Sequence, residues 1–315
     1  MSTSQIDCTD SARFELPAPL TFKRVFQSSP YWAGVNGGLV PQVIKPLRHN
    51  QRKPSYLLSL NDRPLVLPAT ATARQAPFFD LHRHSINPIV EHAGQAGIGP
   101  ALIYSSFDKG FVITEYLEGR CWTAVDFQQT NNIERLAELL KQLHGLPKEK
   151  APIFSASKTE QCLWAEIRRD SIDIPKRLHG LQLRMQKVIS LLQAGHRQGV
   201  VCHNNLQGSH VLETEQGMRL LGWESAAIND PYYDLVVVAH SHKFNKAQLD
   251  HLLFCYAGST SFDERENVDY NYAIYIYLQA LRCAMVADKD RQPAQQIMLE
   301  THVDALLALL HRLGV

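Results

Sequence analysis

The segment VVCHNNLQGSHVLE, residues 200–213, holds the residue types that could do chemistry. Its two imidazoles, His203 and His210, could bind zinc, but this spacing in a loop matches no strong zinc signature and no Cys–His cluster completes it. Cys202 beside His203 could form a nucleophile–base pair. Neighbouring residues at the end of a strand point to opposite faces, however, which favours a buried thiol at Cys202.

The spacing of residues in this segment matches that of a phosphoryl-transfer site, but the residue types differ from the usual ones. Such sites place a carboxylate two residues after a His, where it accepts or orients the substrate hydroxyl. They place a magnesium-binding Asn seven residues after the same His. Here Asn205 and His210 stand at these two positions after His203. The spacing indicates a loop that delivers two groups to one point, although neither group is the usual one.

Several ordered motifs carry a family resemblance. This chain reads CHNNLQGSHVL and then LLGWESAAINDPYYDLVVVA, and it resembles the aminoglycoside phosphotransferase, choline kinase and thiamine kinase-like family, whose members typically read cHgDlxxxNil and then liDWEyagxgDPxfDLA. Upstream, GIGPALIY and FVITEYLEGRCW are similar to the strands that lead to the hinge, and LAELLKQLHGLP is similar to the LaxxLxxLHxlp helix. The resemblance covers about residues 35–260. It implies an α+β, two-lobed, protein-kinase-like fold with a small mostly-β lobe and a larger helical lobe.

The resemblance implies structural roles for residues that this chain retains. His203 would brace the catalytic loop, and Asp230 and Asp234 would fix the backbone of the large lobe. Trp223 and Glu224 follow the position of a metal-binding Asp, and structural roles are expected for both. Glu224 as a substitute metal ligand is the alternative.

The same resemblance places the reacting groups at three altered positions. The base position holds Asn205, which has the shape of Asp but cannot accept a proton, and a placed general base contributes roughly 10²–10⁴-fold. The two metal-ligand positions hold His210 and Gly222. Magnesium prefers oxygen ligands, whereas imidazole suits zinc or copper and glycine offers no side chain. The sequence therefore predicts an inactive base and no magnesium ligand at these positions.

The side that would hold the nucleotide also departs from the family pattern. The strand RPLVLPATA should carry a phosphate-binding Lys or Arg near its end, but it carries Pro68. The following helix should supply a Glu near position 86, where Ile86 stands, and Glu91 comes more than a turn later. Two usual contacts to the nucleotide are therefore absent from their expected positions.

Other nucleotide contacts remain candidates. The glycine-rich turn is either reduced to Gly37–Gly38 or replaced by HNQRKPS at 49–55, where Arg52 and Lys53 could reach an anion. The expected hinge between the lobes, where backbone could still bind a purine, consists of Glu115, Tyr116 and Leu117. A further hypothesis is a cage for a cationic alcohol formed by Tyr270, Tyr272, Tyr275 and Tyr277. Packing of these four side chains in a helical core is the favoured alternative.

The hydrophobic pattern predicts a β-rich region followed by a helical one. Apolar runs with turn residues between them predict strands at 38–47, 55–60 and 64–69, two more around the turn FDKG, and one at 217–223. Helical periodicity predicts helices at 84–96, 131–147, 179–196, 270–287 and 293–312. We expect an N-terminal arm at 1–30, an N-lobe at 31–118 and a C-lobe at 119–315, with the lobes meeting near Tyr116–Gly119.

Composition narrows the function classes. Among 315 residues, 45% are hydrophobic and the formal net charge is +1, which favours a globular protein and argues against a nucleic-acid or anionic membrane partner. The six cysteines are widely spread and are expected to be reduced core thiols. With no signal peptide expected in the first residues, a cytoplasmic protein is the prediction.

Scaffold residues are kept while chemistry residues are changed, and this pattern favours a pseudokinase that binds a small molecule or partner protein between its lobes. No cofactor is predicted with certainty; ATP is a candidate ligand, and magnesium binding is expected to be weak or absent. One alternative is an active phosphotransferase for choline, thiamine or an aminoglycoside-like alcohol, with metal bound through Glu224 or His210. Another is a non-catalytic scaffold or regulatory subunit. The oligomeric state is left open.

Overall fold

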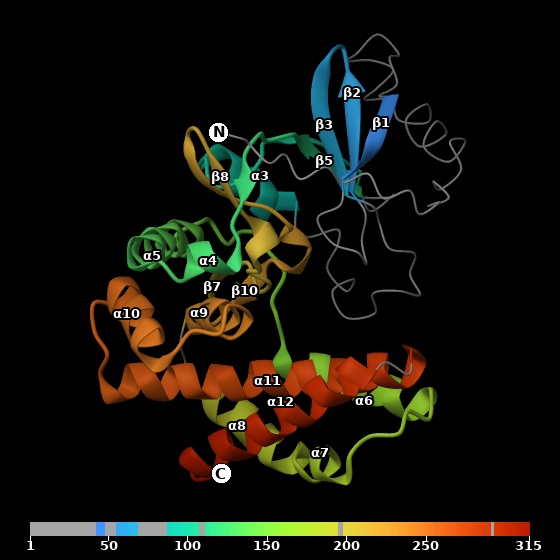
Figure 1. The fold of residues 1–315 in the computed structure, drawn as a ribbon, viewed down its shortest axis with the longest axis vertical. Coiled ribbons are helices and arrows are strands. Elements are labelled where there is room, and N and C mark those ends of the chain that lie inside the picture. Colours follow the sequence, from blue (N-terminus) through green and yellow to red (C-terminus); the bar gives the residue numbers. More distant parts are fainter. Residues whose placement is uncertain (1–41, 48–54, 69–86, 107–110, 195–197, 291–292) are drawn as a thin grey trace.

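The computed structural model describes residues 42–47, 55–68, 87–106, 111–194, 198–290 and 293–315, and every structural statement below concerns these ranges. An antiparallel sheet comes first and a mostly helical region follows (Figure 1). This arrangement confirms the predicted α+β fold class. The expected arm at 1–30 lies outside the described residues, as do Gly37–Gly38, Arg52, Lys53 and Ile86.

The first sheet is five-stranded and antiparallel, in the order β1-β2-β3-β5-β4. Its strands are β1 (Gln42–Leu47), β2 (Ser55–Leu60), β3 (Arg63–Pro68), β4 (Leu102–Ser106) and β5 (Phe111–Glu115). The predicted turn between β2 and β3 is a two-residue loop, Asn61–Asp62, in which both φ angles are positive at 50° and 60°. Asn and Asp tolerate this left-handed backbone, so a tight hairpin forms without glycine.

A short helix connects this sheet to the rest of the molecule. α3 (Asn87–Gln95) packs against β4, and Pro88 lies in its first turn, where proline is tolerated. The GIGP segment then turns the chain into β4. In this segment the Ile98 carbonyl accepts a hydrogen bond of 2.6 Å from the Leu220 N–H, so the sheet region is tied to the strands of the helical region.

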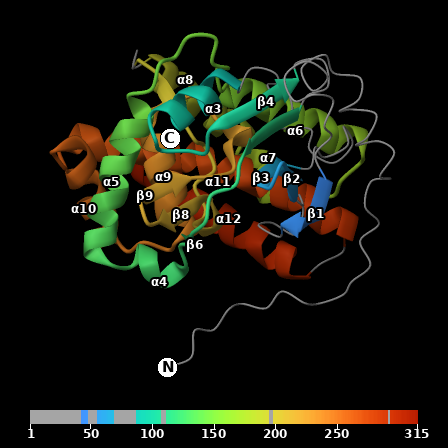
Figure 2. The same ribbon diagram turned by 90° about the horizontal axis from the view of Figure 1, so that it is seen from above.

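The helical region is built around one long helix. Its helices are α4 (Ala124–Phe127), α5 (Thr130–His144), α6 (Ala156–Arg169), α7 (Lys176–Gly180), α8 (Gln182–Ala194), α9 (Pro231–Ser241), α10 (Lys246–Ala257), α11 (Phe262–Asp290) and α12 (Pro293–Arg312). α11 runs across the base of the molecule and packs against α6, α8, α9 and α12. Figures 1 and 2 both place α5 and α10 on one side of the molecule and β1–β3 on the other.

Five short strands lie within the helical region. They are β6 (Arg120–Cys121), β7 (Val200–Cys202), β8 (Val211–Thr214), β9 (Gly217–Leu220) and β10 (Ala227–Asn229). β6, β8 and β9 form one small sheet, and β7 pairs with β10 in another. The two small sheets enclose the segment from His203 to His210, which is the predicted catalytic loop.

The apolar stripe predicted for α5 is the buried face of that helix: Ile133, Leu136, Leu139, Leu140 and Leu143 are each 4% exposed or less. Gly145 ends the helix, as predicted. On α11, Tyr277 is fully buried, and its hydroxyl accepts from Trp164 Nε1 at 2.8 Å and donates to Glu160 at 3.1 Å. This bonding favours core packing over a ligand cage for Tyr277.

Three predicted elements have different bounds in the structure. The helix expected at 179–196 is interrupted between Gly180 and Gln182, so α7 and α8 are separate. The strand expected at 217–223 ends at Leu220, because Gly222 adopts the left-handed conformation with φ 75°. The helix expected at 270–287 is the central part of the longer α11. No described helix is both long and apolar enough to cross a membrane.

Several histidines of the helical region are buried or half-buried and are held neutral. Burial lowers the pKa of His203, His240 and His242 to about 4 in each case. His240 on α9 and His302 on α12 face each other with Nε2 atoms 3.3 Å apart, and burial also lowers the pKa of His302. Charging such groups inside the fold is unfavourable.

The free energy of unfolding should therefore fall as the pH drops from about 6.5 towards about 4. An unfolded His has a pKa of about 6.5, so in this window the unfolded chain binds more protons than the native chain. The stabilisation is fully present above about pH 6.5. Urea unfolding across this range measures it. His240→Gln should flatten the pH dependence, whereas substitution of the exposed His311 by Gln should leave it unchanged; equal slopes would contradict this account.

Candidate functional site

A single carboxylate orders the loop that follows β7. Asp234, fully buried on α9, accepts the backbone N–H of His203 at 2.8 Å and that of Asn204 at 2.7 Å, one on each oxygen. Asp230 caps the same helix by accepting the Tyr232 N–H at 2.9 Å, and Pro231 occupies the first helical position. The sequence DPYYD thus begins α9 and places the side chain of Asp234 against the loop.

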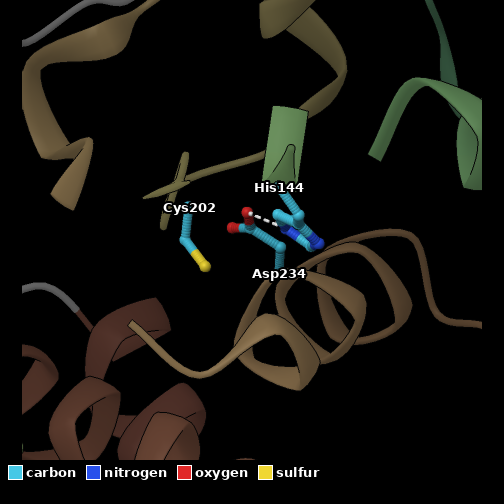
Figure 3. A group of neighbouring side chains, drawn as sticks. All are labelled: His144, Cys202 and Asp234. Carbon is cyan, nitrogen blue, oxygen red and sulfur yellow. Dashed lines mark hydrogen bonds and ion pairs between the residues drawn. The ribbon is translucent and has the colours of Figure 1, made fainter. Parts of the chain in front are cut away.

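Figure 3 shows the side chains gathered around this carboxylate. His144, from the end of α5, lies 3.2 Å from Asp234 Oδ2 through its Nε2, while its Nδ1 bonds the Tyr256 hydroxyl at 2.7 Å. Cys202 donates its S–H to the Asp230 carbonyl at 3.5 Å. Potential metal-ligand atoms of His144, Cys202 and Asp234 lie within 4.8 Å of one another.

The hydrogen bonds assign this cluster a structural role instead. Both oxygens of Asp234 already accept backbone N–H groups, and burial raises the pKa of the Cys202 thiol well above its usual value. A thiol must lose its proton to bind a metal, so Cys202 is a poor ligand. His144 and Tyr256 were not singled out in the sequence; the LH pair in LAELLKQLHGLP was the signal for His144.

His203 connects the loop to the segment that carries Gly222. Its ring is fully buried and donates from Nε2 to the Leu221 carbonyl at 2.8 Å. Its Nδ1 has no hydrogen-bond partner among the described residues. Burial, with a smaller contribution from nearby His210, lowers its pKa to about 4, so the ring is neutral. This geometry is consistent with the predicted bracing role.

Asn204 is a second loop residue that sequence reasoning missed. Its φ is +62°, a conformation that asparagine adopts more readily than most residues. Its side-chain amide donates to the Ser225 carbonyl at 3.0 Å and accepts from Asn229 at 2.8 Å. These bonds join the loop to both ends of the segment before α9.

Asn205, at the predicted base position, is engaged within its own loop. Its side-chain oxygen accepts from Gln207 Nε2 at 3.1 Å. Its carbonyl accepts from the Gln207 N–H at 3.0 Å and from His210 Nδ1 at 2.6 Å. The amide cannot remove a proton from an alcohol.

The two predicted metal-ligand positions come together in the structure. A Cβ atom built on Gly222 would lie 2.6 Å from both Cδ2 and Nε2 of His210. Positions 205, 210 and 222 therefore converge, as the spacing of the motifs implied. They offer one neutral amide oxygen, an imidazole and no side chain, which does not fit a magnesium ion that prefers several hard oxygen ligands.

Trp223 and Glu224 form a short 3₁₀ turn directly after Gly222. Trp223 is buried, donates from Nε1 to the Leu220 carbonyl at 3.0 Å, and packs so closely on Gly99 that a Cβ there would lie 3.0 Å from the indole ring. Glycine at position 99 permits this approach of the sheet region. Glu224 is half-buried and lies in this turn, two residues after Gly222.

The predicted nucleotide side is described only in part. Glu115, at the end of β5, accepts the Ala101 N–H at 2.7 Å with its carboxylate, and the Tyr116 N–H donates to the Pro64 carbonyl at 3.2 Å. Leu117 follows and is half-buried. Pro68 ends β3 opposite Ser55, while the exposed Glu91 lies on α3 near Gln95. The Glu115 carboxylate thus bonds the residue that directly precedes β4 in the same sheet.

The chain is similar to known phosphotransferases. The model of the phosphotransferase enzyme family matches residues 43–268, well over half of the chain. No curated protein sequence matches it. Among solved structures, a choline/ethanolamine kinase family protein from Mesorhizobium loti is 20% identical and has a TM-score of 0.66, with 91% of this chain and 93% of that chain covered.

Two further solved structures are similar to this chain over most of its length. The choline kinase LicA from Streptococcus pneumoniae is 15% identical with a TM-score of 0.68, covering 89% of this chain and 97% of that one. The GDP complex of aminoglycoside 2'-phosphotransferase-IIIa is 16% identical with a TM-score of 0.61, covering 87% and 96%. At such identities the likeness establishes the fold.

Replacing Asp234 by Ala should lower the free energy of unfolding by about 3 kcal/mol or more, because it leaves two loop N–H groups and His144 without their acceptor. Urea denaturation measures the loss. Asp173→Ala is the matched control, since Asp173 is exposed, and its effect should stay within about 0.5 kcal/mol. Similar losses in the two variants would show that Asp234 does not order the loop.

Proposed function

Since the chain belongs to the phosphotransferase enzyme family, we propose that it is a non-catalytic member, a pseudokinase. It would bind a small molecule or a partner protein between the sheet region and the helical region, without magnesium-dependent phosphoryl transfer. One observation carries this proposal: positions 205, 210 and 222 converge at one point, and none of them holds a carboxylate.

The size of the chemical loss supports the proposal. A general base contributes roughly 10²–10⁴-fold to such reactions, and asparagine cannot replace it. The metal ion of phosphoryl transfer neutralises the charge that develops on the phosphate oxygens. A chain that lacks the base and both metal ligands loses two independent contributions to catalysis.

The intact scaffold supports a retained binding function. Asp234 and His203 hold the loop through hydrogen bonds that involve none of the three altered side chains. The loop can thus keep its shape without its chemistry. Related structures include LicA with AMP and APH(2")-IIIa with GDP and kanamycin, and by analogy we propose a nucleotide or a small polar molecule as the ligand.

One observation favours a second candidate, an active phosphotransferase with rearranged ligands. Glu224 is half-buried in the 3₁₀ turn that follows Gly222, and it is the carboxylate nearest in sequence to position 222. In this alternative Glu224 would bind the metal in place of residue 222. Magnesium-dependent turnover that is abolished by Glu224→Gln would establish it.

A thermal-shift panel with ATP, ADP, GTP, choline, thiamine and kanamycin, each with and without magnesium, tests the proposal. We expect a nucleotide to raise the melting temperature equally with and without magnesium, because binding stabilises by mass action and the metal ligands are missing. No phosphoryl transfer to the alcohols should be detected.

Two results would count against the pseudokinase. Robust magnesium-dependent transfer of phosphate to an alcohol that is lost in Asn205→Ala would exclude it. Silence across the panel would favour a scaffold or regulatory subunit without a small-molecule ligand. The exposed Asp173→Ala variant controls for unspecific effects of substitution.

A further inference from the structure

The His210 ring is held firmly in its place. It is 8% exposed, and its Nδ1–H donates to the Asn205 carbonyl at 2.6 Å. Its own backbone is bonded on both sides, with its N–H donating to the Gln207 carbonyl and its carbonyl accepting the Leu221 N–H, each at 2.9 Å. The ring cannot turn away without losing a hydrogen bond inside a packed region.

Gly222 leaves the space that this ring uses. A Cβ on Gly222 would lie 2.6 Å from Cδ2 and Nε2 and 3.0 Å from Cε1 of His210, which is closer than packed carbon atoms approach. Flexible side chains can relieve such overlap, but the His210 ring is buried and tethered. Any side chain at position 222 would therefore compete with the imidazole for one volume.

We infer that His210 closes the former metal site and takes over the structural part of the ion's role. The imidazole bonds the loop through Asn205 and packs on the segment at Gly222, so it joins the two stretches of chain that a metal ion would otherwise bridge. A side chain at position 222 and the imidazole at position 210 exclude each other. The inference uses the proposed function only to identify positions 210 and 222 as metal-ligand positions.

The pairing has a consequence for the loop. The imidazole bridges the two stretches of chain without an ion. Magnesium or a chelator should leave the stability of the loop unchanged. Restoring a carboxylate at position 222 alone should not recreate a metal site, because the imidazole still fills it.

The chain offers a matched control for the steric test. Gly258, at the end of α10, has φ 73°, close to the φ of 75° at Gly222, but a Cβ at Gly258 would meet no atom within 4 Å. Gly222→Ala and Gly258→Ala thus both place a Cβ on a residue with positive φ, with ψ 49° at Gly222 and 1° at Gly258. They differ in the contact with His210.

The experiment compares urea midpoints of four variants: Gly222→Ala, Gly258→Ala, His210→Ala, and His210→Ala combined with Gly222→Ala. We expect Gly222→Ala to lower the midpoint clearly more than Gly258→Ala. In the His210→Ala background, adding Gly222→Ala should cost no more than Gly258→Ala does. Equal midpoints for the two single glycine variants, or an unchanged cost of Gly222→Ala without the imidazole, would overturn the inference. If His210→Ala fails to fold, the comparison of the two glycine variants still decides.

A separate measurement distinguishes this inference from the proposed function. Binding of Mn²⁺ with ADP to the wild-type chain is followed by electron paramagnetic resonance. We expect none at the loop. A Mn²⁺ signal lost in Glu224→Gln would contradict both the closed site and the pseudokinase, whereas failure of the glycine comparison alone would overturn only the steric closure.

Discussion

The site depends on the carboxylate of Asp234 and the two loop N–H groups that it accepts. A buried carboxylate is stable only when hydrogen bonds compensate for the water that it has lost. Here the backbone of His203 and Asn204 and the ring of His144 supply that compensation. Because the partners come from α5, α9 and the loop after β7, one group fixes three elements relative to one another.

Further hydrogen bonds from His203 and Asn204 hold the rest of the loop in place. The His203 ring bonds the Leu221 carbonyl, and the Asn204 side chain bonds Ser225 and Asn229. Position 222 lies between these attachment points, so its place relative to His210 is closely defined. Convergence of positions 205, 210 and 222 is thus a result of the scaffold and does not require a bound ion.

These hydrogen bonds explain how the family fold can persist with unusual residues at positions 205 and 222. The bracing bonds use backbone groups and the side chains of Asp234, His203 and Asn204. Position 205 adds its carbonyl, which any residue would offer, and position 210 adds its imidazole, which bonds that carbonyl. The Asn205 side chain takes no part in these bonds, so a substitution there can leave the shape of the loop unchanged. A side chain at position 222, in contrast, would meet the His210 imidazole.

The sequence by itself determined the fold class, the succession of a β-rich and a helical region, and the family, because hydrophobic periodicity, turn residues such as Asn61–Asp62 and the spacing of motifs are local properties of the chain. It also showed that Asn205, His210 and Gly222 stand at positions where other residues are usual. Only the tertiary structure decided that His144 bonds Asp234, that Asn204 holds the loop, that the helix after Gly180 is interrupted, and that the His210 ring occupies the volume at Gly222. These contacts join residues far apart in the chain or depend on which way a ring turns within a packed interior, and periodicity carries no information about either.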